Sequence, residues 1–149
     1  MVLSGGINCQ GSLESETNKF RLGGMAMILT YAKVMGLIFL AVGILGFIPS
    51  AAPNGMLFGM FMVNGIHNVV HLVSGLVFLA VGLSNNWEFA RRVTLAFAAI
   101  YGLVTVMGFV IPSHVVMGMP MNMADNMLHL TITATALLFG LPERYAYPH

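Results

Sequence analysis

Charged side chains are scarce in this sequence, which is 7% charged and 58% hydrophobic. Because a water-soluble domain is about 25% charged, this scarcity excludes a soluble domain and predicts a chain solvated by lipid. Six Lys and Arg against five Asp and Glu give a net charge of +1, which excludes the basic field that attracts nucleic acid. The single cysteine, Cys9, excludes an internal disulfide and every paired-cysteine metal motif.

The 149 residues leave little room outside a membrane. A helix crossing a hydrocarbon layer of about 30 Å uses about 20 residues, so the chain accommodates about four or five crossings. The apolar stretches cover residues 28–48, 56–83, 93–111 and 122–141. They lack the in-and-out alternation of lipid-facing strands, which favours helices over a barrel. We therefore predict an all-α integral membrane protein, with a four-transmembrane-helix bundle inside residues 25–149.

Residues 1–24 form a polar N-terminal tail that is rich in Gly and Ser. They contain no apolar run ahead of a small-residue cleavage site, so a removable signal peptide is not expected. This composition predicts disorder.

Basic residues predict the orientation of the bundle, because short loops that stay in the cytoplasm are enriched in Lys and Arg. The connections at residues 49–55 and 112–121 contain none. All six fall at the opposite face: Lys19, Arg21, Lys33, Arg91, Arg92 and Arg144. We therefore expect a multi-pass protein with both termini cytoplasmic, in a bacterial inner membrane or a thylakoid-type membrane.

The second and fourth apolar stretches resemble each other at an offset of 58 residues. The identical pairs are Asn64/Asn122, Asn68/Asn126, His71/His129, Leu72/Leu130, Leu79/Leu137, Gly82/Gly140 and Leu83/Leu141. Three of these pairs are polar residues inside a membrane segment. The pattern predicts two repeated helical hairpins, with the second and fourth helices facing each other across an axis along the membrane normal.

Polar residues form one stripe on each of these two helices, because spacings of three, four and seven share a helix face. The eight residues are Asn64, His67, Asn68, His71, Asn122, Asp125, Asn126 and His129. An ionisable group inside a bilayer is costly unless it is paired, so we expect these side chains to meet inside the bundle.

Three interpretations of this stripe remain open. The first is a hydrogen-bonded network in which Asn and Asp cap and bridge helices. The second is a metal ion held by His67, His71, Asp125 and His129, which together offer N and O ligands. The third is a haem or a chlorophyll with His71 and His129 as axial ligands.

A second candidate site lies in the predicted outer loop, where methionines alternate along the chain. Its residues are His114, Met117, Met119, Met121 and Met123. Thioethers are soft ligands suited to Cu(I), so this loop is a candidate soft-metal site. The alternative is that these methionines fill an apolar interface.

Catalysis is not expected. The sequence has no Ser or Cys nucleophile near a His on a sharp turn, and no phosphate loop. Asp125 is the one acid outside the predicted cytoplasmic segments, so no carboxylate pair is available for acid–base chemistry.

Two motifs are paired in this sequence: Asn64-Gly-Ile-His67-Asn68-Val-Val-His71 and Asn122-Met-Ala-Asp125-Asn126-Met-Leu-His129. The first motif is preceded by a Gly43-Ile-Leu-Gly46-Phe47-Ile-Pro49 segment. In these features the sequence resembles the DUF4383 family of small four-helix membrane proteins, over about residues 33–141. The resemblance implies the four-helix topology and the prominence of the His, Asn and Asp residues. It implies no activity.

Together, these observations predict a non-catalytic accessory subunit of a larger bioenergetic complex, photosynthetic or respiratory, with membrane lipids and other membrane-protein subunits as partners. The alternative is a protein that binds a metal or a tetrapyrrole through His67, His71, Asp125 and His129.

Overall fold

A computed structural model of the chain describes residues 9–111 and 113–141. Four α-helices make up most of it: α1 (Cys9–Leu45), α2 (Gly65–Leu83), α3 (Trp87–Val110) and α4 (Met123–Gly140). A short 3-10 helix, η1 (Pro53–Gly55), and the strands β1 (Met56–Leu57) and β2 (Phe61–Met62) join α1 to α2. The strands β3 (Val115–Val116) and β4 (Met119–Pro120) join α3 to α4.

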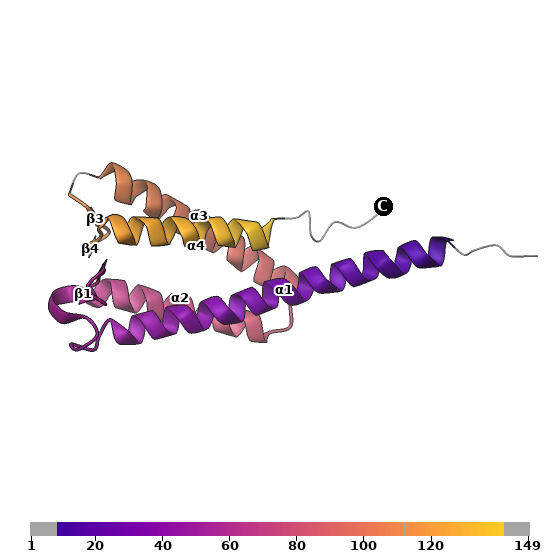
Figure 1. Cartoon of the computed structure of the whole chain (residues 1–149), viewed down its shortest axis with the longest axis horizontal. Coiled ribbons are helices and arrows are strands. Elements are labelled where there is room, and N and C mark those ends of the chain that lie inside the picture. The colour runs from indigo at the N-terminus through magenta and orange to yellow at the C-terminus, as the bar shows by residue number, and fades with distance from the viewer. Residues whose placement is uncertain (1–8, 112, 142–149) are drawn as a thin grey trace, which may run out of the picture.

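The helices form two antiparallel hairpins, α1 with α2 and α3 with α4 (Figure 1). Both strand pairs lie at one end of the molecule, which we name the loop end. The connection from α2 to α3 lies at the opposite end, which we name the terminal end. The N-terminal part of α1 extends past the other helices at the terminal end.

Three helices, α1, α2 and α3, are long and apolar enough to cross a membrane. Helix α4 has 18 residues and does not join them, because it carries Asp125, Asn126 and His129 in its first two turns and three threonines, Thr131, Thr133 and Thr135, near its middle. The chain is therefore an all-helical, membrane-type protein.

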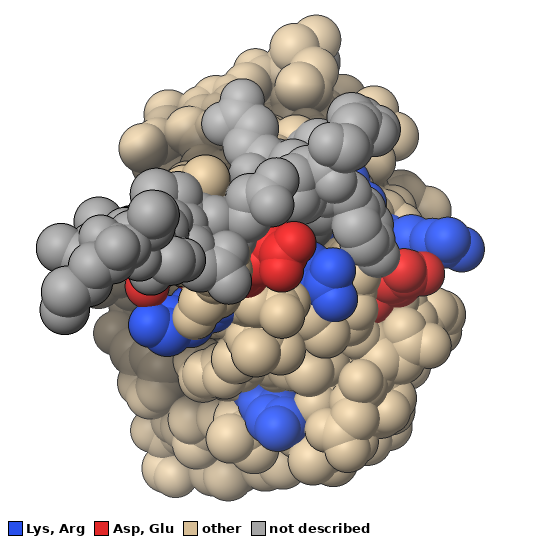
Figure 2. Space-filling view, turned by 90° about the vertical axis from the view of Figure 1, so that its right-hand side faces the viewer, with Lys and Arg blue, Asp and Glu red and all other residues tan. Residues whose placement is uncertain are grey.

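Charged residues gather at the terminal end, which faces the viewer in Figure 2. The described ones outside the loop end are Glu14, Glu16, Lys19, Arg21, Lys33, Glu88, Arg91 and Arg92. Arg91 donates a hydrogen bond from Nε to the Gly140 carbonyl oxygen (2.9 Å), where a cation complements the C-terminal end of α4. Among the described residues, Asp125 is the only formally charged side chain at the loop end.

Asparagine side chains start three of the helices. Asn64, Asn86 and Asn122 each accept a hydrogen bond from the backbone N–H three residues later, which satisfies one of the free donors at a helix N-terminus. Asn122 and Asp125 form a complete capping box, in which the Asp125 carboxylate accepts from the Asn122 N–H.

Each helix buries one stripe, and these stripes make the core between the helices. Its members are Ile28, Tyr31, Ala32, Phe39, Phe78, Val81, Ala90, Ala98, Tyr101, Ile132 and Ala136. Helices α1 and α2 approach each other backbone to backbone. A Cβ at Gly36 would lie 2.6 Å from the Leu79 nitrogen, so no side chain fits at position 36.

The structure corrects two predictions about local structure. Residues 9–24 of the polar tail belong to α1 rather than to a disordered segment, while residues 1–8 lie outside the described part. The second helix begins at Gly65 and not at residue 56, because Phe58 and Gly59 take positive φ values and turn the chain into the β1–β2 hairpin.

The other helix ends differ less from the predicted ones. Helix α1 ends at Leu45 rather than residue 48, and α3 begins at Trp87 rather than residue 93, since Asn86 caps it there. Helix α4, expected at residues 122–141, runs from Met123 to Gly140. Arg144, used in predicting the orientation, lies outside the described residues.

The close approach of α1 and α2 predicts opposite effects for two glycines of one helix. Gly36→Ala should lower the free energy of unfolding by about 1–3 kcal/mol, because the new methyl group meets the α2 backbone. Gly23→Ala should raise it by up to about 1 kcal/mol, since nothing lies within 4 Å of a Cβ there and Ala favours helix. Denaturant unfolding in detergent measures both, and equal effects would show that α1 and α2 are not packed this closely.

Candidate metal centre

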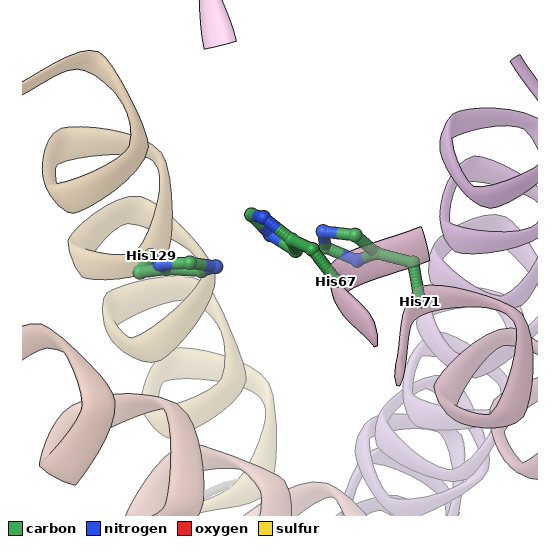
Figure 3. A group of neighbouring side chains, drawn as sticks. All are labelled: His67, His71 and His129. Carbon is green, nitrogen blue, oxygen red and sulfur yellow. The ribbon is translucent and has the colours of Figure 1, made fainter. Parts of the chain in front are cut away.

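Three histidines from two helices meet near the loop end (Figure 3). His67 and His71 lie one turn apart on α2, and His129 faces them from α4. One ring nitrogen of each lies within 4.8 Å of one ring nitrogen of the others. All three side chains are buried, with exposed fractions of 3%, 4% and 4%. The structure thus brings together three of the four residues predicted to bind a metal.

The three rings pack against each other and against aromatic neighbours. Ring centroids lie 4.7 Å apart for His67 and His71, 5.9 Å for His67 and His129, and 6.3 Å for His71 and His129. Phe39 of α1 stacks on His71 at 5.5 Å, and Tyr101 of α3 lies 5.5 Å from His129. All four helices therefore contribute to the site, which restricts the movement of the imidazoles.

The Nδ1 atoms of the three histidines are buried and have no hydrogen-bond partner among the described residues. A buried polar atom without a partner costs about 1–3 kcal/mol. A polar network that served only to join helices would satisfy these atoms with one another or with the backbone. The arrangement instead leaves three nitrogens available to a ligand.

Asp125 does not join this group, which corrects the four-residue metal site expected from the sequence. Its Oδ2 accepts hydrogen bonds from the backbone N–H groups of Asn122 (2.9 Å) and Met62 (3.1 Å). The carboxylate therefore caps α4 and fixes the β1–β2 hairpin. Asp125 does line a small cavity of about 40 Å³ that the three histidines also line.

Asn64 and Asn122 join the two hairpins by an exchange of hydrogen bonds. The Asn64 amide nitrogen donates to the Gly118 carbonyl oxygen in the β3–β4 turn, and that of Asn122 donates to the Met60 carbonyl oxygen beside β2, both at 2.8 Å. Each asparagine thus caps its own helix and holds the loop of the other hairpin. The two donor residues, Asn64 and Asn122, are 58 positions apart, and so are the two acceptor residues, Met60 and Gly118. This is the offset seen between the repeated motifs in the sequence.

Asn68 and Asn126 lie deeper, and each contacts a glycine of its own hairpin: Gly46, directly after α1, and Gly108, near the end of α3. A Cβ at Gly46 would collide with the Asn68 Oδ1 atom, and one at Gly108 with that of Asn126. Asn126 also donates to the Gly108 carbonyl oxygen (3.0 Å). These two predicted residues therefore pack the hairpins and do not belong to the histidine group.

A cavity of about 190 Å³ adjoins the three histidines. Tyr101 and Ser74 line it and bond to each other, with the tyrosine hydroxyl donating to Ser74 Oγ at 3.2 Å. Tyr101 is not among the site residues predicted from the sequence. The available signal was the spacing of Thr94, Tyr101 and Thr105, which places the polar groups of the third helix on one face.

The five residues of the predicted soft-metal loop do not gather at one place. His114, Met117 and Met123 are exposed, whereas Met119 and Met121 are buried, with exposed fractions of 7% and 1%. Met119 and Met121 line the cavity beside the histidines. His114, Met121 and Met123 line a separate pocket of about 430 Å³, and Met117 lines neither space, so the five residues are divided and the soft-metal loop stays a prediction.

This geometry suits a single metal ion better than a tetrapyrrole. With metal–nitrogen distances near 2.0–2.1 Å, three ligating imidazole nitrogens lie about 3.4 Å apart, so small rotations of the rings would close the site. A haem or chlorophyll held by His71 and His129 would need the space between those rings. His67 lies directly beside that space, with its ring centroid 4.7 Å from that of His71 and 5.9 Å from that of His129, where the macrocycle would have to extend.

Fold and site together define a helical, membrane-type protein with a buried three-histidine group. A comparison with known families agrees with the resemblance seen in the paired motifs. The family described as a domain of unknown function (DUF4383) matches residues 30–141, and the chain belongs to this family. The comparisons with curated proteins and with solved structures find no match.

The exchanged hydrogen bonds predict a graded effect of asparagine replacements. Asn86→Ala removes a cap alone and should lower the free energy of unfolding by about 1 kcal/mol. Asn64→Ala and Asn122→Ala each remove a cap and a bond between hairpins, and should cost about 1 kcal/mol more. Denaturant unfolding in detergent measures the difference. Equal losses for all three variants would mean that the exchange contributes nothing to stability.

Proposed function

We propose that the protein binds one transition-metal ion inside the membrane through His67, His71 and His129. Two observations carry the proposal: the three Nδ1 atoms are buried without partners, and one ring nitrogen of each histidine lies within 4.8 Å of one ring nitrogen of the others. Neutral imidazole is a ligand for Zn, Cu, Fe and Ni, and an ion would repay the cost of burying these nitrogens. The aromatic neighbours Phe39 and Tyr101 hold the rings in place for it.

We further propose that the centre binds its ion without catalysing a reaction. Acid–base catalysis needs a titratable group that is free to exchange protons with a substrate. The carboxylate at the loop end, Asp125, is engaged by two backbone N–H groups. This engagement supports storage, transfer or sensing of the ion over chemistry performed on it.

Replacing a histidine should remove the ion without harming the fold. Elemental analysis of protein purified from its native membrane should find about one ion per chain, and His129→Leu should bring this value close to zero. The absorption spectrum should lack a Soret-type haem band and chlorophyll bands. Met117→Leu provides the control, since Met117 is 78% exposed and does not line the cavity at the histidines.

Thermal unfolding of the metal-free protein separates a ligand site from a structural network. His129→Leu removes a buried, unpartnered nitrogen, so the melting temperature should stay unchanged or rise. A clear fall in melting temperature, with no ion found in the wild type, would establish the network and overturn the metal proposal.

We propose that all four helices span the membrane, as two repeated hairpins with both termini cytoplasmic. Helix α4 packs against α3, and its Asp125, Asn126 and His129 side chains are buried, so they are covered by protein and not by lipid. The concentration of Lys and Arg at the terminal end supports the orientation. The membrane would be a bacterial inner membrane or a thylakoid-type membrane.

A second candidate function, the role of an accessory subunit, is favoured by the N-terminal part of α1. Residues 11–20 form helix and are all exposed, with Leu13 and Phe20 at 66% and 65%. Apolar side chains on an extended helix fit a partner subunit of a larger bioenergetic complex. This role is compatible with metal binding, since the two sites lie at opposite ends of the molecule.

Photo-crosslinking in native membranes tests the accessory role. A photoreactive residue at Phe20 should give one discrete adduct with a single membrane subunit, in a fixed ratio to this chain. The same probe at Val110, which is 71% exposed at the loop end of α3, should give only lipid adducts. Lipid adducts alone from both positions would contradict a docked α1.

A further inference from the structure

Two thioethers lie on the wall of the cavity beside the histidines. Met119 and Met121 line the cavity of about 190 Å³ together with His67, His71 and His129. Two hydrogen bonds fix their loop. The Gly118 carbonyl oxygen accepts one from the Asn64 side-chain amide, and the Met121 N–H donates the other to the His114 carbonyl oxygen at 2.8 Å. The Asn64 contact ties this loop to the start of α2, three residues before His67.

Met121 also lines a second pocket, of about 430 Å³, at the loop end. That pocket includes exposed His114 and Met123 and half-buried Met62. Met121 is thus a common wall of an outer pocket, reached from the surface, and of the inner cavity at the histidines. Soft sulfur and imidazole ligands are present on both sides of it.

We infer that the ion is copper(I), and that it reaches the three histidines from the outer pocket by way of Met121. This inference rests on the metal site proposed above and adds the identity of the ion and its path. Thioethers bind Cu(I) in preference to Zn(II), which favours imidazole, thiolate and carboxylate. Met121 is the side chain that both compartments share, so it can hand the ion from one to the other.

The charge of the site points to the same ion. Three neutral imidazoles and two thioethers carry no negative charge, so these ligands do not balance the charge of an ion in a medium of low dielectric constant. The Asp125 carboxylate, which accepts hydrogen bonds from Asn122 and Met62 and lines a small cavity with the histidines, balances one positive charge but not two. Because the desolvation cost grows with the square of the charge, a monovalent ion costs about a quarter of what a divalent ion of the same size costs.

Metal titration of the full chain in lipid nanodiscs tests this inference. Copper(I), supplied as its bicinchoninate complex, should bind the wild type more tightly than Zn(II), and loading should be followed in time. Met121→Leu preserves side-chain volume. It should weaken Cu(I) binding about tenfold or more and slow loading, and leave Zn(II) affinity unchanged. Met117→Leu, in the same loop but 78% exposed and outside both pockets, should behave as the wild type.

The outcomes separate this inference from the proposal on which it rests. If the wild type binds Cu(I) or Zn(II), loses it in His129→Leu and is indifferent to Met121→Leu, the thioether path is wrong and the three-histidine centre stands. If the wild type does not bind Cu(I), the copper inference fails, and if elemental analysis of the native protein also finds no metal, the three-histidine centre fails with it. Copper X-ray absorption that shows a sulfur neighbour in the wild type and not in a Met119→Leu, Met121→Leu double variant would establish the thioether contact.

Discussion

The exchange of amide hydrogen bonds between the two hairpins holds the loop end together. Asn64 and Asn122 each start a helix and, with the same side chain, hold the carbonyl oxygen of the opposite loop. Helices α2 and α4 therefore begin at the same depth. His71 and His129, each seven residues after the capping asparagine of its helix, lie at the same level, and His67 lies one turn nearer the loop end. Without this shared starting point, His129 would have no fixed position relative to His67 and His71.

The histidine group illustrates how a membrane protein can sacrifice stability for binding. Three buried nitrogens without partners oppose folding of the metal-free chain, whereas the aromatic packing of Phe39 and Tyr101 favours it. The bundle thus surrounds the three histidines with packed aromatic side chains. A site of this kind is fully stable only when occupied, because a ligand that binds the folded state alone adds its binding free energy to stability.

The sequence was sufficient to predict that His71 and His129 face each other, because matching polar stripes inside lipid must find partners. It was not sufficient for Asp125, whose carboxylate could serve a metal or a helix cap until the backbone around it was known. The methionines alternate along the chain, which suggests one common face. The turn at Met117 and Gly118, both with positive φ, breaks that alternation and separates the exposed sulfurs from the buried ones. Tyr101 was missed because the stripe that it forms with Thr94 and Thr105 contains no ionisable group that must find a partner inside lipid.

The length of α1 has a mechanical consequence. Its 37 residues span about 55 Å, whereas the hydrocarbon layer is about 30 Å thick. The helix packs against α2 only along its second half, from about residue 29 onward, so the first half acts as a stiff rod anchored at one end. Each residue of a helix turns by about 100°, and inserting a single residue into the rod would swing its outer surface by more than a quarter turn. The length of this helical segment would therefore determine how far from the bilayer its exposed residues 11–20 lie and which side of the molecule they face.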